Sequence, residues 1–151
     1  MKPDVPRVMA GFLGALAADI APSLGSEYAA GNASTMGLAL YFAGQEFERA
    51  AEVRVRENEE MRTLFSQAVA AGAVPDDALR SRLLEASNGT DESLAVSALD
   101  TTNAVLKTLL IELQTTLESS DTGVAARVEE QVWDHLVRSA ECRKLVLPAL
   151  P

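Results

Sequence analysis

Apolar residues recur at every third or fourth position along most of the chain, the spacing that gathers them on one face of an α-helix. The first such series begins after Asp4, a residue suited to cap a helix, and stops before Pro22, which cannot continue one. Its members are Val5, Met9, Phe12, Leu16 and Ile20. The pattern therefore predicts a first helix over residues 5–21.

A second apolar series is much longer and holds gaps of four and three residues for about forty positions. Its members are Ala29, Ala33, Met36, Leu40, Ala43, Phe47, Ala50, Met61, Leu64 and Ala68. The series favours one long helix over residues 27–71. Gly31 and Gly37 are poor helix formers, so a break near the start of this helix is the alternative.

Three shorter patterns follow, separated by the turn sequences AGAVPDD and SNGTDE, and Pro148 ends the last of them. Together the patterns predict an all-α fold, an elongated up-and-down helical bundle that forms a single domain over residues 1–151. Its four main helices are expected at about 5–21, 27–71, 92–118 and 123–147, with a short extra helix at about 76–87.

The predicted helix lengths leave part of the long helix without a neighbour. At about 1.5 Å per residue, residues 27–71 would span about 66 Å, whereas each of the last two helices would span about 35 to 40 Å. The first helix is expected beside residues 28–44 and the short one beside 58–70, which leaves residues 46–57 uncovered.

This uncovered segment carries charges at positions that apolar residues occupy elsewhere in the series, namely Arg54 and Glu57. Such side chains should be wet, paired, or in contact with another subunit. One interpretation is an exposed helix with i,i+4 pairs such as Glu52 with Arg56. The other is an interface with a second copy or another protein, and its candidate residues are Glu52, Arg54, Arg56 and Glu57.

The net charge of −9 and the isoelectric point near 4.6 argue against nucleic acids and anionic membrane surfaces as partners. One cysteine cannot form an internal disulfide, and no apolar run is expected to reach the ~18 residues of a membrane span, so a cytoplasmic location is expected. The stretch VMAGFLGALAAD resembles a signal peptide, but Asp4, Pro3 and Pro6 favour a first helix instead.

The stretch VWDHLVRSAEC holds the only tryptophan, histidine and cysteine of the chain. On a helix, His135 and Cys142 would lie about 10 Å apart, too far for a nucleophilic pair. With a single histidine, the two Glu-x-x-His motifs of a di-iron bundle are excluded. Phosphate-binding loops and nucleophile elbows are also missing. No metal, cofactor or catalytic residue is expected, and the balance is against an enzyme.

Polar residues in the middle of the helix predicted at about 92–118 give the remaining candidate site. Asp100 and Asn103 interrupt an apolar pattern, and polar groups near a core need hydrogen-bond partners or a ligand. With Glu46, Arg49 and His135 they would line a small-molecule pocket. The alternative is an internal hydrogen-bonded layer that sets the helix register.

The expected function is that of a non-catalytic helical module that acts through self-association, as a homodimer, or through binding to another protein. The alternative is a bundle that binds or converts a small molecule in the polar pocket between the long helix and the last two helices.

Overall fold

The computed structural model describes residues 4–148, and this part of the chain is helical without strands. The helices are α1 (Val5–Gly14), α2 (Glu27–Ala70), α3 (Asp77–Ser87), α4 (Val96–Glu118) and α5 (Gly123–Arg143). A π-helix, Ala15–Ile20, and a 3-10 turn, Ala21–Ser23, continue α1. The predicted all-α helical bundle is confirmed, and α2 runs through Gly31 and Gly37 as one helix.

The chain divides into two compact units, and the predicted single domain stays a prediction. The first unit contains residues 1–50 and 144–151, and the second contains residues 51–143. Each unit is described by itself below.

Two predicted helix ends differ from the structure. Helix α4 begins at Val96 rather than near 92, and α5 ends at Arg143 rather than 147. In both cases, residues that were predicted to be helical or lie next to the helix form hydrogen bonds with residues of α2 instead. The segment before α4 is held by Asp91, which accepts hydrogen bonds from α2, and Gln45 bonds both backbone groups of Val146 at 2.8 and 2.9 Å.

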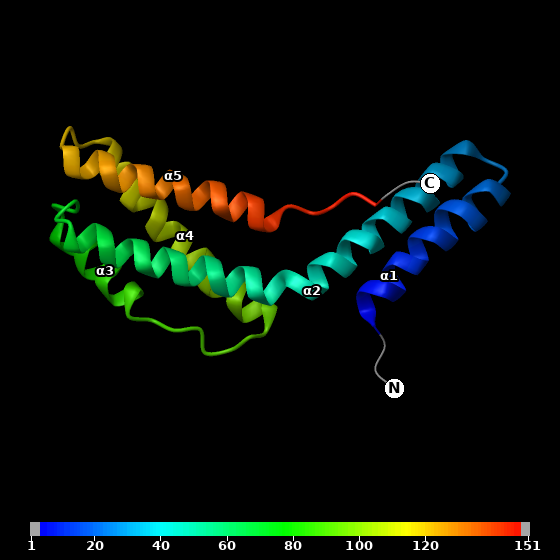
Figure 1. The fold of residues 1–151 in the computed structure, drawn as a ribbon, viewed down its shortest axis with the longest axis horizontal. Helices are drawn as coiled ribbons and strands as arrows, with labels where there is room; N and C mark the ends of the chain where they lie inside the picture. The colour runs from blue at the N-terminus through cyan, green and yellow to red at the C-terminus, as the bar shows by residue number, and fades with distance from the viewer. Residues whose placement is uncertain (1–3, 149–151) are drawn as a thin grey trace. The chain divides into compact units, whose positions relative to one another are not determined.

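In the first unit, α1 lies alongside the first half of α2, as the sequence predicted (Figure 1). Glycines on α2 allow the two backbones to approach. A Cβ atom at Gly44 would lie 2.9 Å from Met9 Cβ, and one at Gly37 would lie 3.1 Å from Leu13 Cα. Asp4 caps α1 by accepting a hydrogen bond from the Arg7 amide at 3.1 Å.

The first unit has almost no interior of bulky side chains. Its buried residues within the described part of the chain are Ala21, Ala33, Gly37, Gly44 and Ala50. Larger apolar side chains are exposed instead, including Tyr28 at 80%, Met36 at 60% and Phe47 at 65%.

One sequence expectation about membranes is wrong. Residues Val5–Ser23 form a helical stretch of 19 residues with a mean hydropathy of 1.2, which is long and apolar enough to cross a membrane by length and composition. Only 6% of this stretch is buried. The expectation failed because it considered uninterrupted apolar runs. Arg7 and Asp19 interrupt the run near the two ends of this stretch, but the mean hydropathy of the stretch is still 1.2.

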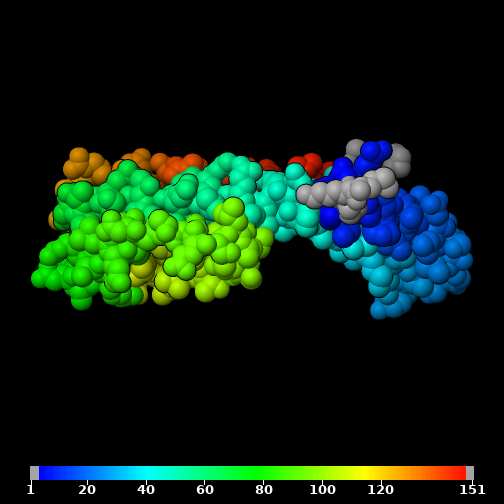
Figure 2. All heavy atoms as spheres, turned by 90° about the horizontal axis from the view of Figure 1, so that it is seen from below, coloured from blue at the N-terminus to red at the C-terminus, as the bar shows by residue number. Residues whose placement is uncertain are grey.

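The second unit is built around a conventional apolar core. The second half of α2, α3, α4 and α5 run alternately up and down, and α3 with the segment after it faces the viewer in Figure 2. Phe65, Met61, Leu83 and Leu113 are completely buried between these helices. Asp76 caps α3 by accepting hydrogen bonds from the next amides along the helix.

Candidate functional site

Glu57 lies inside the second unit, where its side chain is surrounded by hydrogen-bond donors from α4 and α5. The residue is 2% exposed. Its carboxylate accepts hydrogen bonds from Arg143 Nε at 2.5 Å and Nη2 at 2.6 Å, and from the Ser139 hydroxyl at 2.7 Å. Lys107 Nζ lies 3.7 Å away. These groups satisfy both carboxylate oxygens without a ligand.

The electrostatic balance at Glu57 favours the charged carboxylate. Burial by itself would raise the pKa of Glu57. The hydrogen bonds from Arg143 and Ser139 and the charges of Arg143 and Lys107 outweigh burial and lower the pKa to about 2. Glu57 is therefore an ion-paired anchor at neutral pH and holds no proton for acid catalysis.

Asn103 extends this cluster into a continuous hydrogen-bonded layer. Its Nδ2 donates to Glu57 Oε2 at 3.1 Å and to Asn58 Oδ1 at 2.9 Å. Asn58 in turn donates to Asp91 at 3.0 Å, and the Arg62 guanidinium donates to both Asp91 oxygens at 2.9 and 3.2 Å. The bonds from Arg62 and Asn58 keep the pKa of Asp91 below its usual value despite partial burial.

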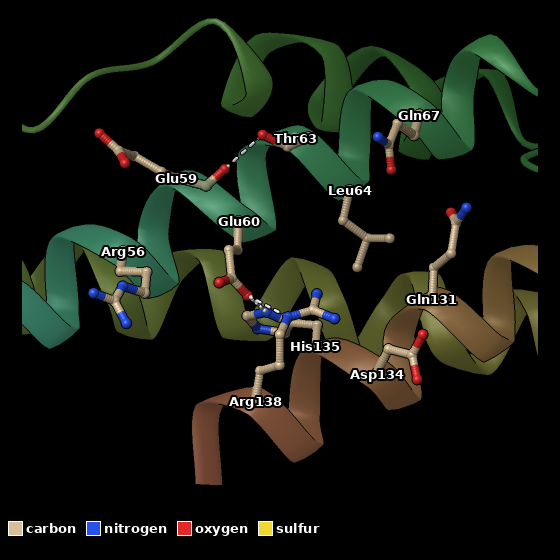
Figure 3. Close-up of a pocket in the computed structure, with 10 residues that line it drawn as sticks. All are labelled: Arg56, Glu59, Glu60, Thr63, Leu64, Gln67, Gln131, Asp134, His135 and Arg138. Atoms are coloured by element: carbon tan, nitrogen blue, oxygen red, sulfur yellow. Dashed lines mark hydrogen bonds and ion pairs between the residues drawn. The ribbon is translucent and has the colours of Figure 1, made fainter. Parts of the chain in front are cut away.

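A separate cleft of about 410 Å³ opens between α2 and α5 (Figure 3). His135, which is 2% exposed, lies on its wall, and His135 Nδ1 is 3.0 Å from Glu60 Oε2. Arg138 Nε donates to the same oxygen at 3.3 Å. The remaining lining residues are Arg56, Glu59, Thr63, Leu64, Gln67, Gln131 and Asp134.

The Glu60 carboxylate fixes the orientation of the His135 ring. When the ring is neutral and its proton is on Nδ1, Nε2 is left as a hydrogen-bond acceptor. A histidine oriented in this way can accept a hydrogen bond or a proton from a bound molecule. Cys142 does not line the cleft, and its sulfur accepts a hydrogen bond from Arg56 Nη1 at 3.6 Å. Between residues 4 and 148, no group of three or more His, Cys, Asp or Glu residues could hold a metal ion.

The five residues proposed as a pocket from the sequence do not line one cleft. Glu46 and Arg49 belong to the first unit, where Arg49 Nη1 donates to the Lys144 carbonyl at 3.0 Å. In the second unit, Asp100 is paired with Arg54, Asn103 lies in the internal layer, and His135 lines the cleft.

The four residues proposed as an interface also separate. Glu52 and Arg56 form the expected exposed i,i+4 pair at 3.0 Å. Arg54 contacts Asp100 at 2.7 Å with its side chain 11% exposed, and Glu57 is interior. Both Arg54 and Glu57 therefore have partners within the second unit. Glu60, Ser139 and Arg143 were not predicted from the sequence, because each is joined to its partner across helices and not along one.

No protein-family model matches the chain, and neither the curated proteins nor the solved structures contain a match. The function therefore rests on the geometry of the two units.

Proposed function

We propose that the chain is a non-catalytic helical module that works by associating with another polypeptide, and that the first unit is the associating part. One observation carries this proposal. Every buried residue in the described part of the first unit is alanine or glycine, while three of its large side chains, Tyr28, Met36 and Phe47, are 60 to 80% exposed. Apolar surface of this kind on a soluble protein usually marks a contact with a partner.

The energetics of the first unit support the same proposal. Ordering a residue costs about 1–2 kcal/mol of backbone entropy, and apolar burial returns only about 25 cal/mol per Å². Five buried residues without long side chains return little of this cost. The second unit instead encloses Phe65, Met61 and Leu83 completely. Contact with another chain would supply the burial that the first unit lacks by itself.

Hydrogen exchange tests the proposal directly. At a concentration where light scattering gives a mass of 16.0 kDa, amides of α1 and of residues 27–50 should exchange much faster than those of α4. They should become protected when the concentration is raised or when a binding partner is added, while α4 amides stay unchanged as the internal reference. Strong protection of residues 27–50 in the 16.0 kDa species would contradict the proposal, because the unit would then need no partner.

A second candidate function is small-molecule binding in the cleft between α2 and α5. The observation that favours it is His135, which is almost fully buried and oriented by Glu60 on the wall of a cleft of about 410 Å³. His135 is the only histidine in the chain, so its ring signals can be followed by NMR without assignment. A ligand in the cleft should shift these signals in the native protein and bind less tightly to the Glu60→Gln variant.

A further inference from the structure

Six exposed residues form a stripe along the first half of α2, here called the seam. They are Tyr28, Asn32, Met36, Ala39, Ala43 and Phe47. At about 100° per residue they fall within an arc of about 100° around the helix axis. Glu46, near one end of the seam, is the only charged residue from Tyr28 to Phe47.

Helix α1 does not occupy the seam. The α2 residues nearest to α1 are Gly37 and Gly44, which approach Leu13 and Met9. Their direction around the α2 axis is about 120° from the middle of the seam. The seam is consequently a second apolar face of the same helix, and the side chains of Tyr28, Met36 and Phe47 on it remain 60 to 80% exposed.

The spacing of the seam is the same when read in either direction. Its successive gaps are four, four, three, four and four residues. A second α2 laid antiparallel about the midpoint between Met36 and Ala39 would therefore match every position of the seam. Tyr28 would meet Phe47 of the second copy, Asn32 would meet Ala43, and Met36 would meet Ala39.

This antiparallel match places large side chains against small ones. The Met36 side chain would pack against the small Ala39 of the second copy, and at each end of the contact the ring of Tyr28 would pack against the ring of Phe47. A parallel match would instead set Ala39 and Ala43 against themselves and leave gaps between the helices. The helix dipoles also oppose each other in the antiparallel arrangement. Glu27 and Glu48, which would lie at one level, point about 150° away from the middle of the seam.

We infer that the partner of the first unit is a second copy of this chain, joined through an antiparallel, two-fold symmetric contact of the two seams. This inference rests on the proposed function and names its partner and surface. With rings of about 200 Å², Tyr28 and Phe47 at 80% and 65% exposure offer about 300 Å² per copy. A standard interface takes about 800 Å² from each partner, so these two rings alone provide more than a third of it.

Disulfide trapping with two differently tagged chains tests the arrangement. Both chains carry Cys142→Ser, and one carries Tyr28→Cys while the other carries Phe47→Cys. On one straight helix these positions are about 28 Å apart, so a link cannot form within a chain. We expect a cross-linked dimer when the two chains are mixed and oxidised, and none with either chain alone.

Other outcomes overturn the inference in distinguishable ways. Cross-links in each single variant alone would mean a parallel seam. A dimer by light scattering without any of these links would mean a different surface, and the proposed function would stand. A monomer at all concentrations would overturn the homodimer, while the proposed function would still stand or fall on the hydrogen-exchange test. Binding of that monomer to vesicles of phosphatidylcholine and phosphatidylglycerol would make lipid the occupant of the seam.

A charge placed in the seam gives an independent test in the full chain. Met36→Glu puts two unpaired carboxylates into the contact and should weaken dimerisation at least about 100-fold. Val137→Glu is the matched control, because Val137 lies on α5 and is 61% exposed against 60% for Met36. This control should leave the dimer unchanged. Equal effects of the two variants would overturn the inference.

Discussion

Replacing Glu57 by glutamine removes one charge from the interior of the second unit while keeping the shape of the side chain. The carboxylate accepts hydrogen bonds on both oxygens, from Arg143 and Ser139 on one and from Arg143 and Asn103 on the other. A glutamine offers only one oxygen, and its amide group would face donors. We therefore expect the Glu57→Gln variant to fold less stably, because the Arg143 guanidinium loses its ion pair with the Glu57 carboxylate.

The magnitude follows from the pKa of Glu57, which drops from its ordinary 4.5 to about 2 in the folded chain. One pKa unit corresponds to about 1.4 kcal/mol, so the charged form contributes about 3 kcal/mol to the free energy of unfolding at neutral pH. The side chains of Arg143 and Lys107 are 36% and 43% exposed, so in the Glu57→Gln variant water can solvate their charges. The loss in the free energy of unfolding should therefore not greatly exceed about 3 kcal/mol. For a unit of this size, the melting temperature should fall by about 15 °C.

The pH dependence gives the sharper measurement. Because the pKa of Glu57 is lower in the folded state, its contribution is complete above pH 4.5 and is lost as the pH falls toward about 2. Between pH 5 and pH 3 the native chain should lose about 2 kcal/mol that the Glu57→Gln variant does not lose. Urea denaturation followed by circular dichroism measures both free energies.

A matched control separates burial from ion pairing. Glu112 is also held by two arginine nitrogens, from Arg82 at 2.6 and 2.8 Å, but its side chain is 39% exposed. Glu112→Gln should change the stability little, because solvent screens an exposed pair. The reasoning about Glu57 is refuted if Glu57→Gln loses as much stability as the native chain between pH 5 and pH 3.

Three further predictions concern packing. Gly44→Ala places a Cβ atom 2.9 Å from a side chain of α1 and should speed hydrogen exchange in α1, whereas Gly31→Ala, with nothing within 4 Å, should not. Asp91→Asn breaks a pair whose side chains are 8% and 10% exposed, so unfolding should become easier by about 3 kcal/mol and the segment 88–95 more open to proteases. Leu113→Ala, at a fully buried position, should lower the free energy of unfolding measured by urea denaturation by about 3 kcal/mol. Ile111→Ala, at 65% exposure, should lower it by less than about 0.5 kcal/mol.

Periodicity was sufficient to predict the helices, because each helix of this chain has an apolar face along at least part of its length. It also predicted the extent of α2 despite Gly31 and Gly37, since the apolar spacing continues across them. The ends of α4 and α5 were less predictable. Where α5 stops, the backbone of Val146 bonds to the side chain of Gln45, which lies 101 positions earlier in the sequence.

The candidate sites were predicted only in part, for a related reason. A charge at an apolar position identified Glu57 as unusual, but its partners lie 46 and 86 residues away, on helices whose register periodicity does not fix. On its own helix, His135 has no carboxylate three or four residues away. Glu60, 75 positions earlier, supplies that carboxylate from α2.

The two units differ in what selects the alignment of their helices. In the second unit, only one register brings Asn103, Ser139 and Arg143 to the Glu57 carboxylate. An apolar cluster of equal volume would often be as stable as such a buried charge, so the gain from this layer is in specificity.

The seam of the first unit has no buried charge, so its register has to come from its length. A shift of the second copy by seven residues toward the start of α2 would leave Ala43 and Phe47 beyond the first residue of the facing helix, Glu27. That shift removes a third of the seam and one ring from each end. A shift of seven residues in the other direction keeps the seam on α2 but sets Tyr28 against Arg54 and Met36 against Glu46. The antiparallel register with Tyr28 against Phe47 is therefore the one that buries the whole stripe against uncharged residues.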